Sequence, residues 1–419
     1  MKYRLDIQGL RGIAVLAVLL FHLDASLLPG GYLGVDIFFV VSGFLIANQI
    51  SNHRRQGTWY LSTYLKRRAL RIFPALFLMI LITLFLGFFL LLPIELQRLS
   101  QSAGLGVLGL VNFYFYWRTD YFDPNFQFAP LIHTWTISIE EQFYLLLPLL
   151  FFIKDTKVRF ITLGLLIVLS FWFCHWTSDQ SSAFYLLIGR FWEFGLGIIA
   201  ALITQRNGSF KANSIISLIS IVVIFLSLAL VHEEFGTPNY YSLPLVLSTT
   251  YLLSTKISSI WIYSILSSST LVFIGNISFS LYLWHQPILA YWEIFSFDLQ
   301  SRNIQVVILF STLLISVLSF KFVETPFRQY GKYPNLKLKI LLLFWICILG
   351  LSLYCQLFGG VPQRLNSNSI RYDEAARSVP ARRAECLSGY KKFVEPGDEN
   401  CRFNTEFPLK AVIWGDSHA

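Results

Sequence analysis

Two ionisable side chains, Arg11 and His22, lie within an apolar stretch near the amino terminus, RLDIQGLRGIAVLAVLLFHL. On an α-helix, side chains with this spacing share one face and lie about 16 Å apart along the axis. Ionisable groups on a membrane helix are expensive and usually mark a pathway or a site. A simpler explanation accounts for the pair equally well: Arg11 is only a positively charged flank of the helix, and His22 is only a polar residue at the membrane interface.

Two guanidinium groups follow in the segment YLKRRALRIFPAL, which contains Arg68 and Arg71. Their spacing puts them on one helix face, just before the third apolar run. A pair of guanidinium forks suits a phosphate or pyrophosphate group. Clustering of positive charge in cytoplasmic loops explains the number of charges equally well, although it does not require this spacing.

Carboxylates and a further histidine lie near the starts of two other apolar runs. The segment GVDIFFVVSGFLI contains Asp36 and Ser42, and HTWTISIEEQFYLLLP contains His133 and Glu140. A histidine near Glu140 makes an acid/base site possible. The alternatives are that Glu140 stabilises a helix amino terminus and that Asp36 is only interfacial.

Two later segments carry reactive residue types. FIGNISFSLYLWHQPIL contains Tyr282 and His285, although an aromatic helix end is often only part of an interfacial belt. AVIWGDSHA contains Asp416 and Ser417 on a turn after a predicted buried strand, which is a common place for a nucleophile. A catalytic triad would need an Asp and a His downstream of the GDSH segment, and this chain holds none there.

The composition predicts the class of element that positions these residues. The chain has 419 residues, 55% hydrophobic and 14% charged, with a mean hydropathy of +0.58, which is typical of a polytopic protein in a lipid bilayer. The net charge of +9 does not indicate nucleic-acid binding, because the basic residues occur in short clusters between apolar runs.

We expect an all-α polytopic membrane protein with about eleven transmembrane helices, followed by a short mixed extracytoplasmic tail. The apolar segment 103–117 is either a further span or a re-entrant or interfacial segment. The predicted spans are 7–23, 34–50, 73–92, 138–153, 159–175, 184–203, 213–231, 243–255, 271–292, 304–322 and 339–358.

The distribution of Lys and Arg predicts the orientation. These residues cluster in 51–72, 154–159 and 321–339, whereas 24–33 and 232–242 contain none. The positive-inside rule therefore predicts a cytoplasmic amino terminus and a tail, 359–419, on the opposite side. There Cys386 and Cys401 either form a disulfide or remain free thiols.

Together, these clusters resemble the acyltransferase-3 family, in particular its O-antigen acetylase type with a fused carboxy-terminal SGNH domain. The motifs YRLDIQGLRGIAVLAVLLFH, GYLGVDIFFVVSGFLI, YLKRRALRIFPAL, HTWTISIEEQFY and GNISFSLYLWHQP stand in the family's order. The resemblance implies an acyltransferase transmembrane domain (1–335), an additional transmembrane helix (336–358), and a periplasmic linker with the first block of a truncated SGNH domain (359–419).

The resemblance also implies roles for individual residues. Arg11 and His22 correspond to the family's Arg-x10-His pair, and Glu140 to the first carboxylate of its Glu-x-Gln-Phe-Tyr motif. Ser417 takes the position of the SGNH nucleophile, beside Asp416, and we expect it to be inactive in this chain. Gln8 stands where the family usually has an acid. The donor-binding pair is Arg68 and Arg71, and the possible supporting residues are Asp36, Ser42, His133, Tyr282 and His285.

By this resemblance we expect an acyltransferase (EC 2.3.1.-) in a bacterial inner membrane. Its donor would be cytoplasmic acyl-CoA, acetyl-CoA in particular, and its acceptor a hydroxyl of an extracytoplasmic or lipid-linked glycan, such as O-antigen in lipopolysaccharide or another surface polysaccharide. We expect no permanently bound cofactor and no metal. Arg68 and Arg71 would bind the CoA phosphates, with Arg11 holding the donor deeper in.

In this scheme His22 would be the general base or a transient acyl carrier, and Glu140 would orient it or take up its charge. Two alternatives remain from the sequence. One is a proton-coupled lipid or sugar transporter in which His22, Asp36 and Glu140 relay protons. The other is an inactive product of a truncated gene.

Overall fold

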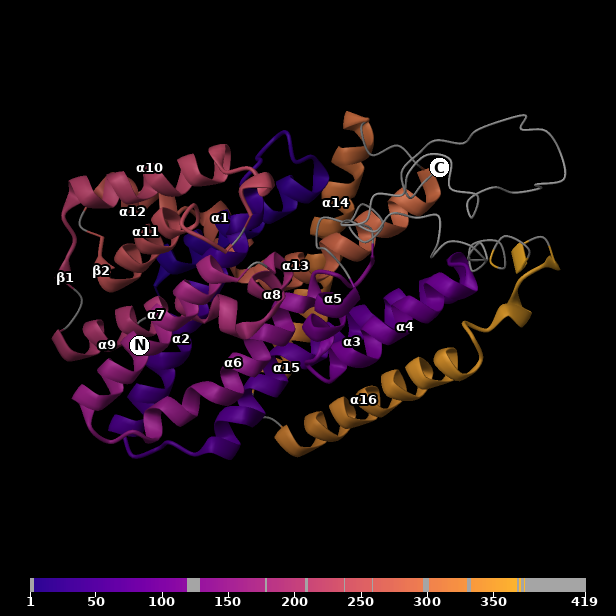
Figure 1. The fold of residues 1–419 in the computed structure, drawn as a ribbon, viewed down its shortest axis with the longest axis horizontal. Coiled ribbons are helices and arrows are strands. Elements are labelled where there is room, and N and C mark those ends of the chain that lie inside the picture. Colours follow the sequence, from indigo (N-terminus) through magenta and orange to yellow (C-terminus); the bar gives the residue numbers. More distant parts are fainter. Residues whose placement is uncertain are drawn as a thin grey trace, which may run out of the picture.

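The computed structural model describes residues 4–118, 129–177, 179–207, 210–236, 238–257, 259–296, 301–329, 333–367, 369–370 and 373. Almost all of this part of the chain is helical, as Figure 1 shows. The prediction of an all-α polytopic membrane protein is therefore confirmed. The predictions for Cys386, Cys401, Asp416 and Ser417 fall outside the described residues.

The long helices follow one another with short connections. Between them lie four short helical segments, of which η3 is a π-helix, and two short strands that pair in parallel. The helices are α1 (Leu5–Leu23), α2 (Gly34–Arg55), α3 (Leu61–Leu90), α4 (Pro93–Val107), α5 (Val111–Arg118), α6 (Thr134–Phe152), α7 (Thr156–Trp176), α8 (Gln180–Tyr185), α9 (Leu187–Asn207), α10 (Ser214–Leu230), α11 (Leu243–Ser254), α12 (Ile260–Leu266), α13 (Ser269–Ser296), α14 (Arg302–Ser319), α15 (Thr325–Arg328) and α16 (Pro334–Leu357). The other elements are η1 (Gly31–Leu33), η2 (Glu233–Phe235), η3 (Phe320–Glu324), η4 (Pro362–Arg364), β1 (Phe210–Lys211) and β2 (Thr255–Lys256).

Every predicted span overlaps one of these helices. Within the described ranges, 7 helices are long and apolar enough to cross a membrane, or 8 if the bent pair α12 and α13 counts as one span. The remaining predicted spans correspond to α6, which carries two glutamates, and to the shorter α10 and α11. The count of eleven spans stays a prediction. The ambiguous segment 103–117 falls on α4 and α5, which meet at Gly109.

The loops predicted to lie on one side of the membrane come together in the structure. At one end of the bundle, Arg54, at the end of α2, donates to the carbonyl oxygen of Phe151 near the end of α6. At the other end, the backbone N–H of Gly30 donates to the carbonyl of Leu228 on α10 at 2.9 Å. These contacts join α2 to the end of α6 at one end of the bundle and the loop containing Gly30 to the end of α10 at the other. The side of the membrane on which each end lies stays a prediction.

Small residues let the central helices touch backbone to backbone. A Cβ atom on Gly9 of α1 would lie 1.8 Å from the carbonyl oxygen of Leu266, and one on Gly275 of α13 would lie 1.9 Å from that of Gln8. A side chain at either position would force the helices apart, which is why small residues are favoured where membrane helices pack closely. Close contact of α1 with α12, through Gly9, and with α13, through Gly275, therefore depends on these glycines.

Helix α16 lies against α4 along one side of the molecule (Figure 1). The segment after α16 is held at the junction of α3 and α4, where Arg364 donates to the carbonyl oxygens of Phe88 and Leu91. Asp373 accepts a hydrogen bond from the backbone N–H of Ile94 at 2.8 Å. These contacts satisfy backbone groups that helix ends leave unpaired.

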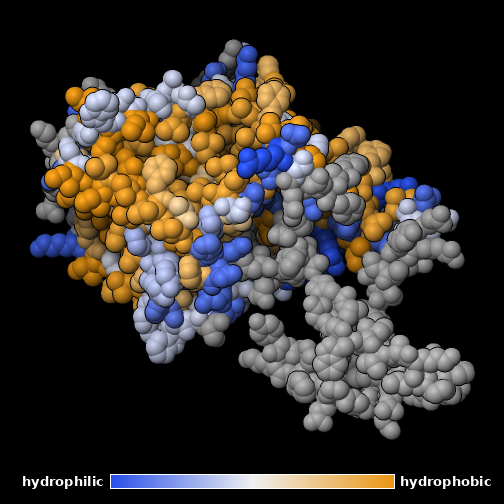
Figure 2. Space-filling view, turned by 90° about the horizontal axis from the view of Figure 1, so that it is seen from above, coloured by the Kyte–Doolittle hydropathy of each residue, from blue (hydrophilic) through white to orange (hydrophobic). Residues whose placement is uncertain are grey.

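The outer helices expose large apolar side chains. Figure 2 shows a broad apolar face, and the exposed residues include Val168 of α7, Phe225 of α10, Phe310 of α14 and Leu343 of α16. An apolar surface of this extent is what a lipid bilayer covers, since water would disfavour it. The functional polar residues are instead enclosed by the bundle.

Candidate active site

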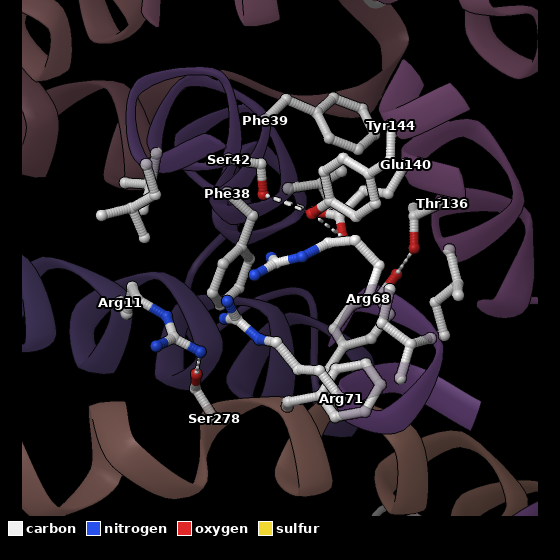
Figure 3. A pocket seen from close by; sticks show the side chains of 17 residues that line it. Arg11, Phe38, Phe39, Ser42, Arg68, Arg71, Thr136, Glu140, Tyr144 and Ser278 are labelled. Carbon is white, nitrogen blue, oxygen red and sulfur yellow. Dashed lines mark hydrogen bonds between the residues drawn. The ribbon is translucent and has the colours of Figure 1, made fainter. Parts of the chain in front are cut away.

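A pocket in the middle of the bundle collects polar side chains from five helices. It encloses about 740 Å³ of empty space, including space open to solvent, and is shown in Figure 3. The lining residues are Arg11 from α1, Val35, Phe38, Phe39, Val41, Ser42 and Leu45 from α2, Arg68, Arg71 and Ile72 from α3, Thr136, Ile137, Glu140 and Tyr144 from α6, and Ser278, Phe279 and Tyr282 from α13. It thus brings together residues predicted from five separate motifs.

Arg11 reaches the pocket from α1 with its guanidinium group fixed by two neutral partners. Its Nη1 donates to Gln8 Oε1 at 3.0 Å, and its Nη2 donates to Ser278 Oγ at 2.8 Å. Gln8 therefore orients Arg11 although it is an amide and not the acid usual in the family. Because neither partner carries a charge, the positive charge of Arg11 is left uncompensated by them.

Arg68 and Arg71 project into the same pocket from α3, one turn apart (Figure 3). Both arginines lie on a helix, as expected, because α3 begins at Leu61 and carries them ahead of the apolar part predicted as the third span. Arg68 Nη2 donates to another neutral group, Gln49 Oε1, at 2.7 Å. Guanidinium groups gathered in this way favour an anionic ligand.

The carboxylate in the pocket is Glu140. Ser42 Oγ donates to its Oε1 at 2.7 Å, and Tyr144 OH donates to its Oε2 at 2.9 Å. These contacts differ from the prediction that Glu140 orients His22, since both carboxylate oxygens are taken by Ser42 and Tyr144. Tyr144 was not predicted from the sequence, although it lies one turn after Glu140 and therefore on the same helix face.

His22 lies in a cluster of imidazole rings next to the pocket. Its ring centroid is 5.1 Å from that of His285, which is in turn 5.3 Å from that of His133. The Nδ1 atom of His22 lies 2.8 Å from the carbonyl oxygen of Val18 on the same helix. The fold therefore unites three histidines that are far apart in the sequence.

Tyr282 connects this cluster to the arginine pocket. It lines the pocket, while its ring lies 5.3 Å from that of His285 and 5.6 Å from that of His133. Its hydroxyl accepts a hydrogen bond of 2.8 Å from Thr136 Oγ1, which also lines the pocket. The cluster and the pocket thus form adjoining parts of one polar region.

Asp36 does not join this region. It forms a buried ion pair with Arg190 of α9, with 3.0 Å between Oδ1 and Nη1, and the same Nη1 lies 3.1 Å from Glu193 Oε1. Arg190 and Glu193 were not predicted from the sequence. Charged residues one turn apart within an apolar run nevertheless indicate a buried ion pair. Buried ions of this kind need their partners, so the cluster ties α2 to α9.

The histidine cluster does not form a metal centre by its geometry. Across the ranges that the structure describes, no group of three or more His, Cys, Asp or Glu side chains is arranged to hold a metal ion. The polar region instead offers guanidinium donors, a hydrogen-bonded carboxylate, a tyrosine and imidazoles, which are groups suited to anion binding and proton transfer.

Comparison with known proteins defines the class. Residues 4–321 match the acyltransferase domain family, and the chain therefore belongs to the acyltransferase-3 family. Both the predicted family and the predicted enzyme class, an acyltransferase, are confirmed.

Among its relatives is the O-acetyltransferase OatA of Staphylococcus aureus strain NCTC 8325 / PS 47, which is 31% identical over 358 residues. OatA of strain COL has the same identity over the same length. In both cases the aligned region covers 79% of this chain, which spans only 58% of the length of the relative. No solved structure matches the chain.

Proposed function

We propose that the protein is a membrane-bound O-acetyltransferase that moves an acetyl group from cytoplasmic acetyl-CoA to a hydroxyl of a glycan on the opposite side of a bacterial inner membrane. The observation that carries this proposal is the adjacency of an arginine pocket and a histidine cluster, which share Tyr282. One part suits an anionic donor and the other a hydroxyl acceptor.

The donor site is formed by Arg11, Arg68 and Arg71. CoA carries phosphate and pyrophosphate groups, for which guanidinium forks are suited, and its pantetheine arm is less polar. The apolar side chains of Phe38 and Leu45 line the same pocket and offer this arm a matching surface. The family match supports this acyltransferase interpretation over the transporter alternative.

The acceptor site is centred on His22. Because the carbonyl oxygen of Val18 can only accept a hydrogen bond, the His22 Nδ1 that lies 2.8 Å away carries the hydrogen. The lone pair is then on Nε2, which can take the proton of an acceptor hydroxyl as a general base. The hydroxyl oxygen forms a bond to the acetyl carbonyl carbon, the C–S bond breaks, and the thiolate of CoA leaves with the electron pair.

Glu140 has a different role from the one that the sequence suggested. Held by Ser42 and Tyr144, it lines the same pocket as the three arginines. A fixed carboxylate at this place orients the guanidinium groups electrostatically and limits their mutual repulsion while no donor is bound.

The acceptor would be a surface polysaccharide, such as O-antigen, or a lipid-linked glycan, with the amino terminus of the enzyme in the cytoplasm. In this proposal 1–335 is the acyltransferase domain, 336–358 an additional span, and 359–419 a periplasmic linker with the first block of a truncated SGNH domain.

Replacing His22 with alanine tests the proposal. The variant His22→Ala should abolish O-acetylation of surface glycan in cells that lack the wild-type gene, because the base is removed, and mass spectrometry of the glycan measures the missing acetyl mass. The matched control is His175→Ala, which changes an exposed histidine of α7. Normal acetylation by membrane-inserted His22→Ala would refute the assignment of His22.

A further inference from the structure

His285 places a second imidazole directly against His22. The two rings meet at an interplanar angle of 60° with 5.1 Å between their centroids. His285 is 1% exposed, whereas His22 is half-buried. The close glycine contact between α1 and α13 holds the two histidine-bearing helices together.

The hydrogen bond at Nδ1 determines which nitrogen of His285 has a lone pair. Its Nδ1 lies 2.6 Å from the carbonyl oxygen of Tyr282, so this nitrogen carries the hydrogen. Nε2 is then an acceptor, and among the described residues this buried atom has no hydrogen-bond partner. Leaving a buried acceptor unpaired is unfavourable, so a donor is expected at this atom during the reaction.

We propose that His285 is a positioning residue whose Nε2 accepts a hydrogen bond from the Nε2–H that His22 gains on taking the acceptor's proton. This inference rests on the proposed function, in which His22 is the base. In the resting enzyme both Nε2 atoms are acceptors and have no proton to share. Once His22 is protonated it becomes a donor on both nitrogens, and His285 supplies the acceptor that it then needs.

Every proton and bond in this step is accounted for. The O–H bond of the acceptor breaks and its proton moves to His22 Nε2, while the new C–O bond forms and the C–S bond of the acetyl thioester breaks. His285 gains no proton and only accepts the hydrogen bond. His22 then returns the proton to the departing thiolate, directly or through water, which yields the free thiol of CoA and restores the neutral imidazole.

Four other titratable residues in the described part of the chain lie near the rings of His22 and His285. From α13, Tyr282 packs on His285, and from the segment before α6, His133 does so too. On η1, Tyr32 packs against Phe21, beside His22. At the end of α1, the carboxylate of Asp24 accepts hydrogen bonds from Ser26.

The test uses sealed inverted membrane vesicles that contain the full chain and its endogenous glycan acceptor and that are filled and suspended in buffer of the same pH. Acetyl-CoA labelled in the acetyl group is added, and the initial rate of label entering alkali-labile esters is measured from about pH 5 to pH 8.5. The variants are His285→Phe, which removes the acceptor atom but keeps a ring, and His285→Gln, whose amide oxygen can accept a hydrogen bond.

We expect His285→Phe to lower the maximal rate about 10- to 100-fold, because a hydrogen bond to a charged group is lost. In the plot of initial rate against pH, the rate falls on the acidic side as His22 becomes protonated. The midpoint of this fall should move about one to two pH units lower, since protonated His22 is less stabilised. His285→Gln should recover much of both effects.

A purely structural role predicts reduced rates and lower protein levels with an unchanged midpoint, and it gives His285→Gln no advantage over His285→Phe. Either of these results would overturn the inference. Such a result would leave the proposed function intact, because that is judged separately by the loss of activity in His22→Ala.

Discussion

At the scale of single residues, the arginines of the pocket differ from the structural arginines in the nature of their partners. Arg190 is paired with Asp36 and Glu193. Arg11, in contrast, is held by Gln8 and Ser278, which are neutral. Neutral partners orient a guanidinium group without cancelling its charge, so the pocket keeps an excess of positive charge for an anionic ligand.

This excess leads to a prediction for the donor site. The double variant Arg68→Ala with Arg71→Ala should weaken CoA binding about 10-fold or more for each arginine, because each guanidinium–phosphate hydrogen bond is charge-assisted. The measurement is the thermal stabilisation of the purified protein as CoA is titrated.

Lys66→Ala is the matched control for the arginine variants, because Lys66 is a cation on the same helix but is exposed. Its loss should leave the CoA titration unchanged. If the double arginine variant were stabilised by CoA as well as the wild type, Arg68 and Arg71 would not belong to the donor site.

At the scale of elements, the packing of α1 against α13 aligns both parts of the site. It brings Arg11 to Ser278 at one level and His22 to His285 at another. Gly275 allows this packing, because a Cβ there would lie 1.9 Å from the carbonyl oxygen of Gln8. A wider spacing would disturb both parts of the site together.

We therefore expect Gly275→Ala to destabilise the protein by about 1–3 kcal/mol through overpacking and to reduce acetyl transfer. Gly164→Ala is the control on α7, where no atom lies within 4 Å of the added Cβ, and it should be neutral or slightly stabilising. Thermal unfolding in detergent measures the difference. Equal melting temperatures for the two variants would contradict the proposed importance of this helix contact.

Much of this arrangement could be predicted from local pattern. The three-residue spacing of Arg68 and Arg71 correctly indicated a shared helix face, because helix geometry alone determines it. The span predicted at 73–92 covers only the later part of α3, because hydropathy marks the apolar residues and the helix itself begins at Leu61 in a polar segment.

The partners of the site residues could not be predicted in the same way. The hydrogen bonds from Ser42 and Tyr144 to Glu140 depend on how α2 packs against α6, which no local spacing specifies. The same is true of the three histidines, each of which gave only a weak signal in its own segment. Tertiary packing brings the three histidines, which lie in separate segments, into one cluster.

At the scale of the whole molecule, the proposed acetyl transfer needs a site that can be reached from both sides of a membrane. Arg54 lies against the end of α6 at one end of the bundle, and the loop containing Gly30 meets the end of α10 at the other. From α1, Arg11 faces the pocket and His22 faces the cluster about 16 Å further along the helix. The central claim is therefore transfer of an acetyl group across the bilayer through this one region.

The most direct test uses sealed inverted vesicles, whose outer surface is the cytoplasmic face, supplied with acetyl-labelled acetyl-CoA from outside. We predict that wild-type vesicles esterify glycan in the lumen, where an added impermeant esterase cannot remove the label, and that His22→Ala vesicles do not. Label found only on glycan that the esterase can reach, or luminal label that persists in His22→Ala, would contradict the account.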